Sequence, residues 1–266
     1  MAFAGLNVGN SKDYLKFTDR TAEQQEGLYR YEGISPPAGL ARSNVKFLRR
    51  EVSFEDIRGR ENEFSIEEQG FCLSSFSTGM SDEEYGDREK IRDTLYPEVR
   101  EVLKRLTGAS IAHVWSHVVT QRHLRPSKSY HMSDIYKVRG KHADDEGPLD
   151  HAHIDNTKSW AAEMFELYCR KPSANIAPWQ KYEFYNLWVP LRPVRSFPLA
   201  LCDQRTVKPE DVIPTKHHKK DRVRQNYLLR YDPAQRWYFK HNQKPSEAWI
   251  FYQGGNRFEN KLGMPA

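Results

Sequence analysis

The sequence predicts a fold of the α+β class that is mainly β, with helices in the first half of the chain and an antiparallel barrel or sandwich in the second. Three observations support this prediction. Short aromatic and β-branched runs, divided by Pro, Asp and Asn, fill residues 181–253. Helical periodicity occurs in two earlier segments, 81–108 and 156–171. The chain has 266 residues, of which 38% are apolar and 12% aromatic, and this is enough for one large core.

The first part of the chain is predicted to be an arm followed by two strands. Residues 1–44 are polar and contain the turn Pro36–Pro37, so we expect an arm laid over a core domain of residues 45–266. Residues 44–54 alternate between apolar and polar side chains, which predicts a strand. Residues 58–76 are expected to form a turn, a short hydrophilic segment and a second strand.

Residues 81–108 are predicted to be helical. Ser81 followed by acidic residues is typical of a helix N-cap, and Gly108 is typical of a helix end. Pro97 is expected to divide the stretch into two helices, because proline disrupts the hydrogen bonds of a helix interior. Apolar side chains recur at helical spacing at Val99, Leu103 and Leu106.

Three segments connect the predicted helix to the second half of the chain. Residues 109–122 are rich in β-branched residues and predict a strand that carries His113 and His117 on one face, where each is more often a core or rim residue than a ligand. The charged segment 124–148 is expected to be mobile or lid-like. Residues 156–171 predict an amphipathic helix.

The remaining runs predict five strands, and the charge between them is uneven. The net charge is +5, from 41 basic and 36 acidic side chains, and the densest basic cluster is residues 216–224. We interpret this cluster as a solvated loop beyond Pro214, with a patch for an anionic partner as the alternative. No nucleic-acid-binding module is present, so we expect no such partner. The predicted strands lie within 181–191, 198–207, 225–232, 235–241 and 247–253.

Cysteine usage and hydropathy indicate in which cellular compartment the protein is expected. Cys72, Cys169 and Cys202 are odd in number and far apart, which predicts free buried thiols in a reducing compartment. No run approaches the roughly 18 apolar residues of a membrane helix, and the first residues lack the layout of a secretory leader. We therefore expect a soluble cytoplasmic protein without a membrane partner.

The segment LDHAHIDNT, residues 149–157, contains the spacing H-x-D. On an extended strand, alternation places His153 and Asp155 on the same face, where an imidazole and a carboxylate can bind one cation. Non-haem iron enzymes use this arrangement. Three matching letters also arise by chance in a chain of this size, so the surrounding sequence has to decide.

Four stretches give this segment its context. They are DIRGRENEFSIEEQGF (56–71), HIDNT (153–157), YNLWVPLRPVRSFPLALCDQRTVKPEDVIP (185–214) and NYLLRYDPAQRWYFKHNQKPSEAWIFYQ (226–253). Together they resemble the AsaB-type hydroxylase/desaturase family, which includes gibberellin desaturase and a cephamycin methoxylation protein and is abundant in fungal secondary metabolism. The resemblance covers most of residues 45–258.

The resemblance implies a double-stranded β-helix, the jelly-roll or cupin-like core of iron(II)/2-oxoglutarate oxygenases, with the N-terminal helices packed outside it. In such enzymes the His and Asp of H-x-D and a distal His form a facial triad, which leaves positions open for co-substrate and oxygen. His153 and Asp155 fall on the first two positions, whereas His151 falls outside the motif. A basic residue beyond the distal His normally holds a 2-oxoglutarate carboxylate.

The last residues depart from the family pattern. The family continues into an Arg-Phe-Thr-Pro-His segment, and the matching stretch here is NRFENKLGMPA (256–266). Arg257 and Phe258 align, while Lys261 stands where the triad histidine is expected. The sequence stops at Ala266, before the strand that carries the carboxylate-binding Arg. A lysine ammonium has no lone pair to offer a metal ion.

Three hypotheses follow, two of them for a natural-product tailoring enzyme on this scaffold. The first is redox-neutral cyclisation, isomerisation, dehydration or pericyclic chemistry, with His153, Asp155 and Lys261 as acid, base or electrostatic groups. The second is an Fe(II)/2-oxoglutarate-dependent hydroxylase or desaturase with a substituted third ligand. The third is a non-catalytic partner of an active paralogue. The candidates for the substituted ligand are His117, His151 and His241.

The expected cofactor follows from these hypotheses. We expect either no cofactor or Fe(II), and any metal would be held by His153 and Asp155. We do not expect 2-oxoglutarate, because the distal His and the carboxylate-binding Arg are missing.

The expected partners are a small hydrophobic substrate and a second chain. A polycyclic or polyketide-like substrate suits a pocket lined by aromatic side chains, and arginines can hold its carboxylate or enol. For each arginine a structural salt bridge is the competing assignment. A homodimer or heterodimer is expected through an exposed C-terminal edge. The candidate substrate-binding residues are Tyr185, Trp188, Arg192, Arg205, Arg230, Trp237 and Arg257.

Overall fold

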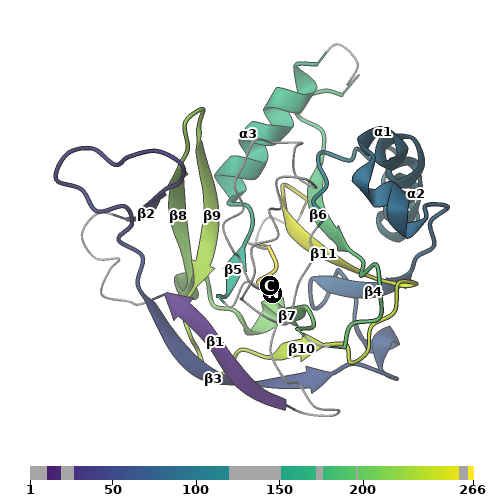
Figure 1. The fold of residues 1–266 in the computed structure, drawn as a ribbon, viewed down its shortest axis with the longest axis horizontal. Helices are drawn as coiled ribbons and strands as arrows, with labels where there is room; N and C mark the ends of the chain where they lie inside the picture. The colour runs from purple at the N-terminus through teal and green to yellow at the C-terminus, as the bar shows by residue number, and fades with distance from the viewer. Residues whose placement is uncertain (1–10, 19–26, 120–150, 172–175, 196, 258–262) are drawn as a thin grey trace.

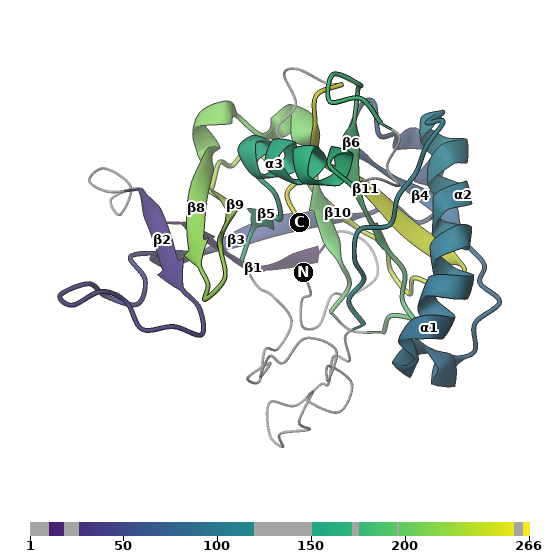
Figure 2. The ribbon, with the colours of Figure 1, turned by 90° about the horizontal axis from the view of Figure 1, so that it is seen from above.

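Curved β-sheets surround one aromatic core, and helices cover its outside (Figures 1 and 2). The prediction of a mainly β fold with helices packed outside is therefore confirmed. The computed structural model describes residues 11–18, 27–119, 151–171, 176–195, 197–257 and 263–266.

The described strands form three sheets, with the strand orders β1-β3-β10-β7, β4-β11-β6 and β2-β8-β9-β5. The strands are β1 (Ser11–Thr18), β2 (Leu28–Tyr31), β3 (Phe47–Asp56), β4 (Phe71–Ser75), β5 (His153–Ile154), β6 (Glu183–Trp188), β7 (Ala200–Cys202), β8 (Val212–His218), β9 (Val223–Leu229), β10 (Trp237–Phe239) and β11 (Glu247–Gly255). The α-helices are α1 (Arg88–Lys90), α2 (Tyr96–Thr107) and α3 (Lys158–Cys169). A π-helical turn spans Ile91–Leu95, and 3₁₀ turns span Glu61–Glu63, Asp82–Gly86, Gln204–Thr206 and Pro209–Asp211.

The predicted N-terminal arm is in part a strand of the core. β1 pairs along its whole length with β3, and Leu15 and Phe17 of β1 are completely buried. The Phe17 ring packs edge-to-face on Trp237 of β10. The expectation that residues 11–18 lie over the core is wrong, because their apolar side chains alternate into it. The division into an arm and a domain at residue 45 stays a prediction.

The helical stretch 81–108 is confirmed, and its ends follow from capping. The Glu84 carboxylate accepts a hydrogen bond from the backbone N–H of Ser81, as in a capping box. Gly108 ends α2 with a positive φ of 69°. Pro97 lies in the first turn of α2, after the π-helical turn, so proline marks a change of helix type rather than a gap. α2 packs outside the sheet of β4, β11 and β6.

The strand predicted at 109–122 is wrong for residues 109–119, which have no regular secondary structure. No backbone ladder joins this segment to a sheet. Side chains hold it instead, because the Tyr96 hydroxyl lies 2.8 Å from Nδ1 of His117 and the His113 ring stacks on Tyr168 at 4.4 Å between centroids. These two histidines thus tie the segment to α2 and α3 without strand pairing among the described residues. The segment 124–148, expected to be lid-like, lies outside the described residues.

The later strands are confirmed in β6, β7, β9, β10 and β11, but β8 was missed. Pro214 and the start of the basic cluster 216–224 lie in β8, which pairs with β9 and β2. The predicted solvated loop is wrong there, because residues 212–218 pair with β9 and β2, and the Glu32 carboxylate near β2 contacts His217 and Lys219. The basic residues of this segment suggested a loop, and the carboxylate that pairs with them, Glu32, is far away in the sequence.

The three cysteines are free thiols, and of them Cys202 is buried. Among the described residues, none of the helices combines the length and apolar content that crossing a bilayer requires.

Candidate functional site

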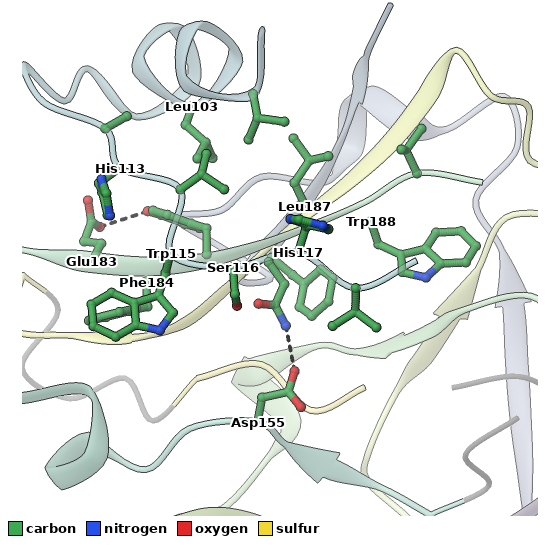
Figure 3. A pocket seen from close by; sticks show the side chains of 18 of the residues that line it. Leu103, His113, Trp115, Ser116, His117, Asp155, Glu183, Phe184, Leu187 and Trp188 are labelled. Atoms are coloured by element: carbon green, nitrogen blue, oxygen red, sulfur yellow. Dashed lines mark hydrogen bonds between the residues drawn. The ribbon is translucent and has the colours of Figure 1, made fainter. Parts of the chain in front are cut away.

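A cavity of about 1530 Å³ lies between β5, β6, α2, α3 and the segment 109–119. His153 and Asp155 are at its base, next to the described C-terminal residue Ala266. Figure 3 shows Asp155 on one side of β6 and Leu103 of α2 on the other. The H-x-D residues therefore face a large cavity, as a substrate site requires.

His153 is held in one orientation by its own neighbours. Its Nδ1 donates a hydrogen bond to the carbonyl of His151 at 3.0 Å. Donation from Nδ1 leaves Nε2 with the lone pair in the neutral ring. This Nε2 lies 3.4 Å from Oδ1 of Asp155, so the prediction that His153 and Asp155 share one face is confirmed. Nε2 and Oδ1 are therefore placed to share a proton or to bind one metal cation together.

Asp155 is fixed by a second contact from the opposite wall. Nδ2 of Asn186, on β6, donates to its Oδ2 at 2.6 Å. Burial alone would raise the pKa of Asp155, but the hydrogen bonds from His153 and Asn186 outweigh burial and lower it to about 2. The carboxylate is therefore an anion at neutral pH, with 48% of the side chain accessible from the cavity.

The backbone around this pair is pinned by the C-terminal residues. The amides and carbonyls of His153 and Ala266 exchange two hydrogen bonds, at 2.9 and 3.2 Å. The buried Gln253 side chain accepts from the amide of Asp155 and donates to the carbonyl of Met264. Gly263 has a φ of 107°, and a Cβ there would lie 2.9 Å from Ile154. Residues 263–266 thus hold the backbone of the H-x-D segment in place through hydrogen bonds.

These contacts correct one expectation about assembly. Met264 and Ala266 are buried and bonded to Tyr252 and His153, so residues 263–266 do not present the exposed C-terminal edge on which a dimer was expected. The dimer itself stays a prediction.

The candidate third ligands do not join the pair among the described residues. His151 is adjacent, with ring centroids 5.2 Å apart from His153, but its ring packs against Phe47. Burial lowers the pKa of His151 to about 3, so it is neutral. His117 lines the cavity and contacts Tyr96, whereas His241 is absent from the lining. Within the described ranges, no three His, Cys, Asp or Glu side chains are grouped to hold a metal ion. Lys261 lies outside those ranges.

Four of the candidate substrate-binding residues line the cavity: Tyr185, Trp188, Arg192 and Arg257. Arg192 lies 3.7 Å from the Asp82 carboxylate and is 84% exposed, so it can turn toward a ligand.

Three candidate substrate-binding residues lie elsewhere. Trp237 is buried in the core between Phe17 and Phe54. Arg205 makes a salt bridge with Asp203, which is the competing assignment considered from the sequence. Arg230 is held through its backbone, whose N–H donates to the carbonyl of Asp211. These three residues do not line the cavity, because alternation and local charge do not show which side of a curved sheet faces it, and their role in substrate binding stays a prediction.

Sequence reasoning missed Asn186, Glu183 and Gln253. Asn186 shares a strand face with the predicted Trp188, so a polar residue inside an aromatic run was the available indication. Glu183 accepts hydrogen bonds from the Tyr185 hydroxyl at 2.9 Å and from Arg257 at 3.1 Å. No local pattern pointed to Gln253, because its partners are far away in sequence.

The charge of the described lining is mixed with a basic excess. It carries six basic side chains against the three carboxylates of Asp82, Asp155 and Glu183. This excess favours a ligand with an anionic group. The basic side chains are Lys181, Arg192, Arg195, Arg222, Arg224 and Arg257.

Comparison with known proteins places this site in a family. The sequence profile of a family described as "Oxidoreductase/YMDC permease-like domain" matches residues 15–260. The alpha-ketoglutarate-dependent dioxygenase tstK of Talaromyces stipitatus is 28% identical over 205 residues, which are 76% of this chain and 70% of its own. The hydroxylase/desaturase efuI of Hormonema carpetanum is 25% identical over 226 residues, which are 78% and 72% of the two chains.

A solved structure supports the fold. The iron and alpha-ketoglutarate-dependent endoperoxidase NvfI superposes with a TM-score of 0.73 at 20% identity, covering 98% of this chain and 90% of its own. The double-stranded β-helix expected from the sequence is thereby confirmed.

Proposed function

The chain belongs to the hydroxylase/desaturase family of fungal natural-product oxygenases that its matching profile and relatives define, and from this premise we propose that it oxidises a hydrophobic small molecule at an Fe(II) ion held by His153 and Asp155. Bound Fe(II) with 2-oxoglutarate as co-reductant would supply the activation of dioxygen that oxidises an unactivated C–H bond. The protein's own part is to hold the ion, orient the substrate and exclude water.

The approach of Nε2 of His153 to Oδ1 of Asp155 at the cavity is the observation that supports this proposal. Nε2 and Oδ1 are 3.4 Å apart, and a cation between them would satisfy both. Imidazole and carboxylate are two of the ligands in a two-histidine, one-carboxylate set for Fe(II). The carbonyl on Nδ1 and the Asn186 amide on Oδ2 are the outer contacts that orient metal ligands. The residues present therefore fit the ion, with a third protein ligand not assigned.

The expected cofactors change accordingly. The expectation of no cofactor conflicts with the family, and the expectation that 2-oxoglutarate is not used has no support among relatives whose names carry alpha-ketoglutarate. We propose that 2-oxoglutarate binds in the cavity, where the basic excess of the lining can receive its carboxylates.

The proposed substrate is apolar over most of its surface. Aromatic side chains from three different elements line the cavity, and aromatic walls bind apolar rings and chains by area burial. They are Trp160 and Phe165 of α3, Phe184 and Trp188 of β6, and Phe251 of β11.

The test is a metal titration of the purified protein under anaerobic conditions, with Mn(II) as the redox-inert stand-in for Fe(II). We expect one Mn(II) per chain, and loss of that binding in His153→Ala. His241→Ala is the matched control, because His241 is outside the cavity lining, and it should bind Mn(II) as the unchanged protein does. Binding of 2-oxoglutarate should require the metal.

The redox-neutral hypothesis is the second candidate, and the sequence observation that favours it is Lys261 at the position matching the triad histidine. In that case a proton lies between His153 and Asp155. Full-length protein that binds no Mn(II), yet turns over its substrate without oxygen, would establish this alternative and overturn the Fe(II) proposal.

A further inference from the structure

Every residue of β6 lines the cavity, although successive side chains of a strand point to opposite faces. On one face Asn186 contacts Asp155. On the other face Leu187 belongs to the same hydrophobic cluster as Leu103 of α2, and both also line the cavity. Figure 3 shows Leu103 and Asp155 on opposite sides of the strand. The cavity therefore extends along both faces of β6.

The sheet order explains how one cavity reaches both faces. β6 pairs with β11 on one side and is the terminal strand of its described sheet. Because the segment 109–119 also lines the cavity, we infer that the hollow passes around this edge of the described sheet. We call the part that contains His153 and Asp155 the inner chamber, and the part between β6 and α2 the outer chamber.

The outer chamber is apolar with one polar end. Val99 and Leu103 of α2 face Leu187 and Tyr185 of β6. The polar end is the Tyr185 hydroxyl, which donates to Glu183 at 2.9 Å. A tyrosine oxygen that donates its hydrogen still has lone pairs that accept from a ligand hydroxyl.

Arg257 makes this polar end rigid. Its Nη1 lies 3.1 Å from the Glu183 carboxylate and 3.3 Å from the carbonyl of Thr107 at the end of α2. A cation is well placed at the C-terminal end of a helix, where the carbonyls carry partial negative charge. The Glu183 side chain is only 9% exposed, so its carboxylate has little contact with water. The Arg257 guanidinium balances its negative charge instead. The pair of Tyr185 and Glu183 is thus preorganised to recognise a neutral hydroxyl.

We propose that the substrate is an elongated, largely apolar alcohol that passes around the edge of β6, with its hydroxyl on Tyr185 in the outer chamber and its reacting carbon at His153 and Asp155 in the inner chamber. The inference rests on the proposed function and defines its substrate class. Length and a remote hydroxyl are the two features that the cavity selects.

The test uses 1-hexanol, 1-octanol and 1-decanol as probes, titrated calorimetrically into the metal-free protein. Affinity should rise with each added methylene, up to about fourfold per group, because the chain continues into the inner chamber. Leu103→Trp fills the outer chamber and should weaken all three alcohols at least tenfold. Leu167→Trp, an exposed position of α3 outside the lining, is the matched control and should change nothing.

Tyr185→Phe tests the hydroxyl contact with a minimal change of shape. It should weaken 1-octanol by about two- to tenfold. Methyl octyl ether, which cannot donate a hydrogen bond, should bind both proteins equally. Equal weakening of alcohol and ether, or alcohol binding that Leu103→Trp leaves intact, would overturn the proposal.

These results are independent of the metal. The Mn(II) affinity of Leu103→Trp should match that of the unchanged protein, so failure of the alcohol series leaves the metal result standing. Failure of Mn(II) binding, in turn, does not alter the alcohol affinities.

Discussion

Two histidine–carboxylate pairs in this protein use the same chemistry in different surroundings. His217 lies 2.6 Å from the Glu32 carboxylate through Nδ1 and 2.8 Å from the Asn226 side chain through Nε2, so both ring nitrogens are engaged. His153 donates from Nδ1 to a backbone carbonyl and turns Nε2 toward Asp155 at 3.4 Å in an open cavity. The first pair is saturated, and the second has room for a cation.

The difference shows what turns such a pair into a candidate site. The Glu32 pair joins β2 to β8, and Lys219 adds a further ion pair at 2.9 Å to the same carboxylate. Its polar atoms are satisfied by the protein, which suits a structural contact. In the His153 pair, Nε2 and the Asp155 carboxylate face each other at the cavity, and the described protein places no further partner on Nε2. Unused bonding capacity, rather than residue type, marks the site.

The largest effect should appear when the two carboxylates are neutralised in turn. Asp155→Asn removes an anionic ligand and should lower the affinity for Mn(II) by more than about 100-fold, beyond the 10- to 100-fold typical of outer contacts. Glu32→Gln should leave Mn(II) affinity unchanged. Calorimetric titration of both variants checks the contrast. Equal losses would show that the two pairs do not differ in metal binding.

The second-largest effect concerns the stability of the fold, and it should come from the pair of Glu32 and His217. The hydrogen bond from His217 lowers the pKa of Glu32 to about 2, against a partly opposing effect of burial and with help from Lys219. Glu32→Gln should therefore lower the free energy of unfolding by about 1–2 kcal/mol at pH 7, a value reduced for solvent screening of a side chain that is 32% exposed.

The contribution of Glu32 to the free energy of unfolding should depend on pH, and the direction of its pKa shift gives the sign of this dependence. The folded pKa is below the ordinary value of 4.5, so the contribution of Glu32 is complete above about pH 5 and disappears as the pH falls through 2. Urea unfolding of the unchanged protein and Glu32→Gln between pH 7 and 2 should converge at the acidic end. A difference that stays constant over this range would contradict the assignment.

A smaller effect is expected from the outer contact of Asp155. Asn186→Ala removes the 2.6 Å hydrogen bond to Oδ2, and should reduce Mn(II) affinity about tenfold because the carboxylate is less well oriented. Asn226→Ala is the matched control, since the Oδ1 of Asn226 lies 2.8 Å from Nε2 of His217 in the other pair. Its Mn(II) affinity should be unchanged, and an equal reduction in both variants would argue against a positioning role for Asn186.

The smallest effect tests the predicted binding role of Arg205. Arg205 is half exposed and pairs with Asp203 and Glu68 outside the cavity. Arg205→Ala should lower the free energy of unfolding by about 1 kcal/mol or less and leave alcohol and Mn(II) binding unchanged. A clear loss of 1-octanol affinity would restore Arg205 as a binding residue.

Local sequence was sufficient for several parts of the molecule. The alternation of H-x-D predicted that His153 and Asp155 share a face, because strand geometry is local. Ser81 and Gly108 marked the limits of a helical stretch for the same reason, since capping involves neighbours along the chain. The family resemblance supplied the jelly-roll arrangement that alternation left open between barrel and sandwich.

Tertiary structure decided which residues meet. Leu15 and Phe17 became core because β3 lies beside them, and residues 109–119 form no strand because none of the described strands pairs with them. Asn186 reaches Asp155 across 31 residues of chain, and Gln253 reaches it across 98. Periodicity assigns a side chain to a face, but only packing determines what lies opposite, and the opposing group is what gives His153 and His217 their different roles.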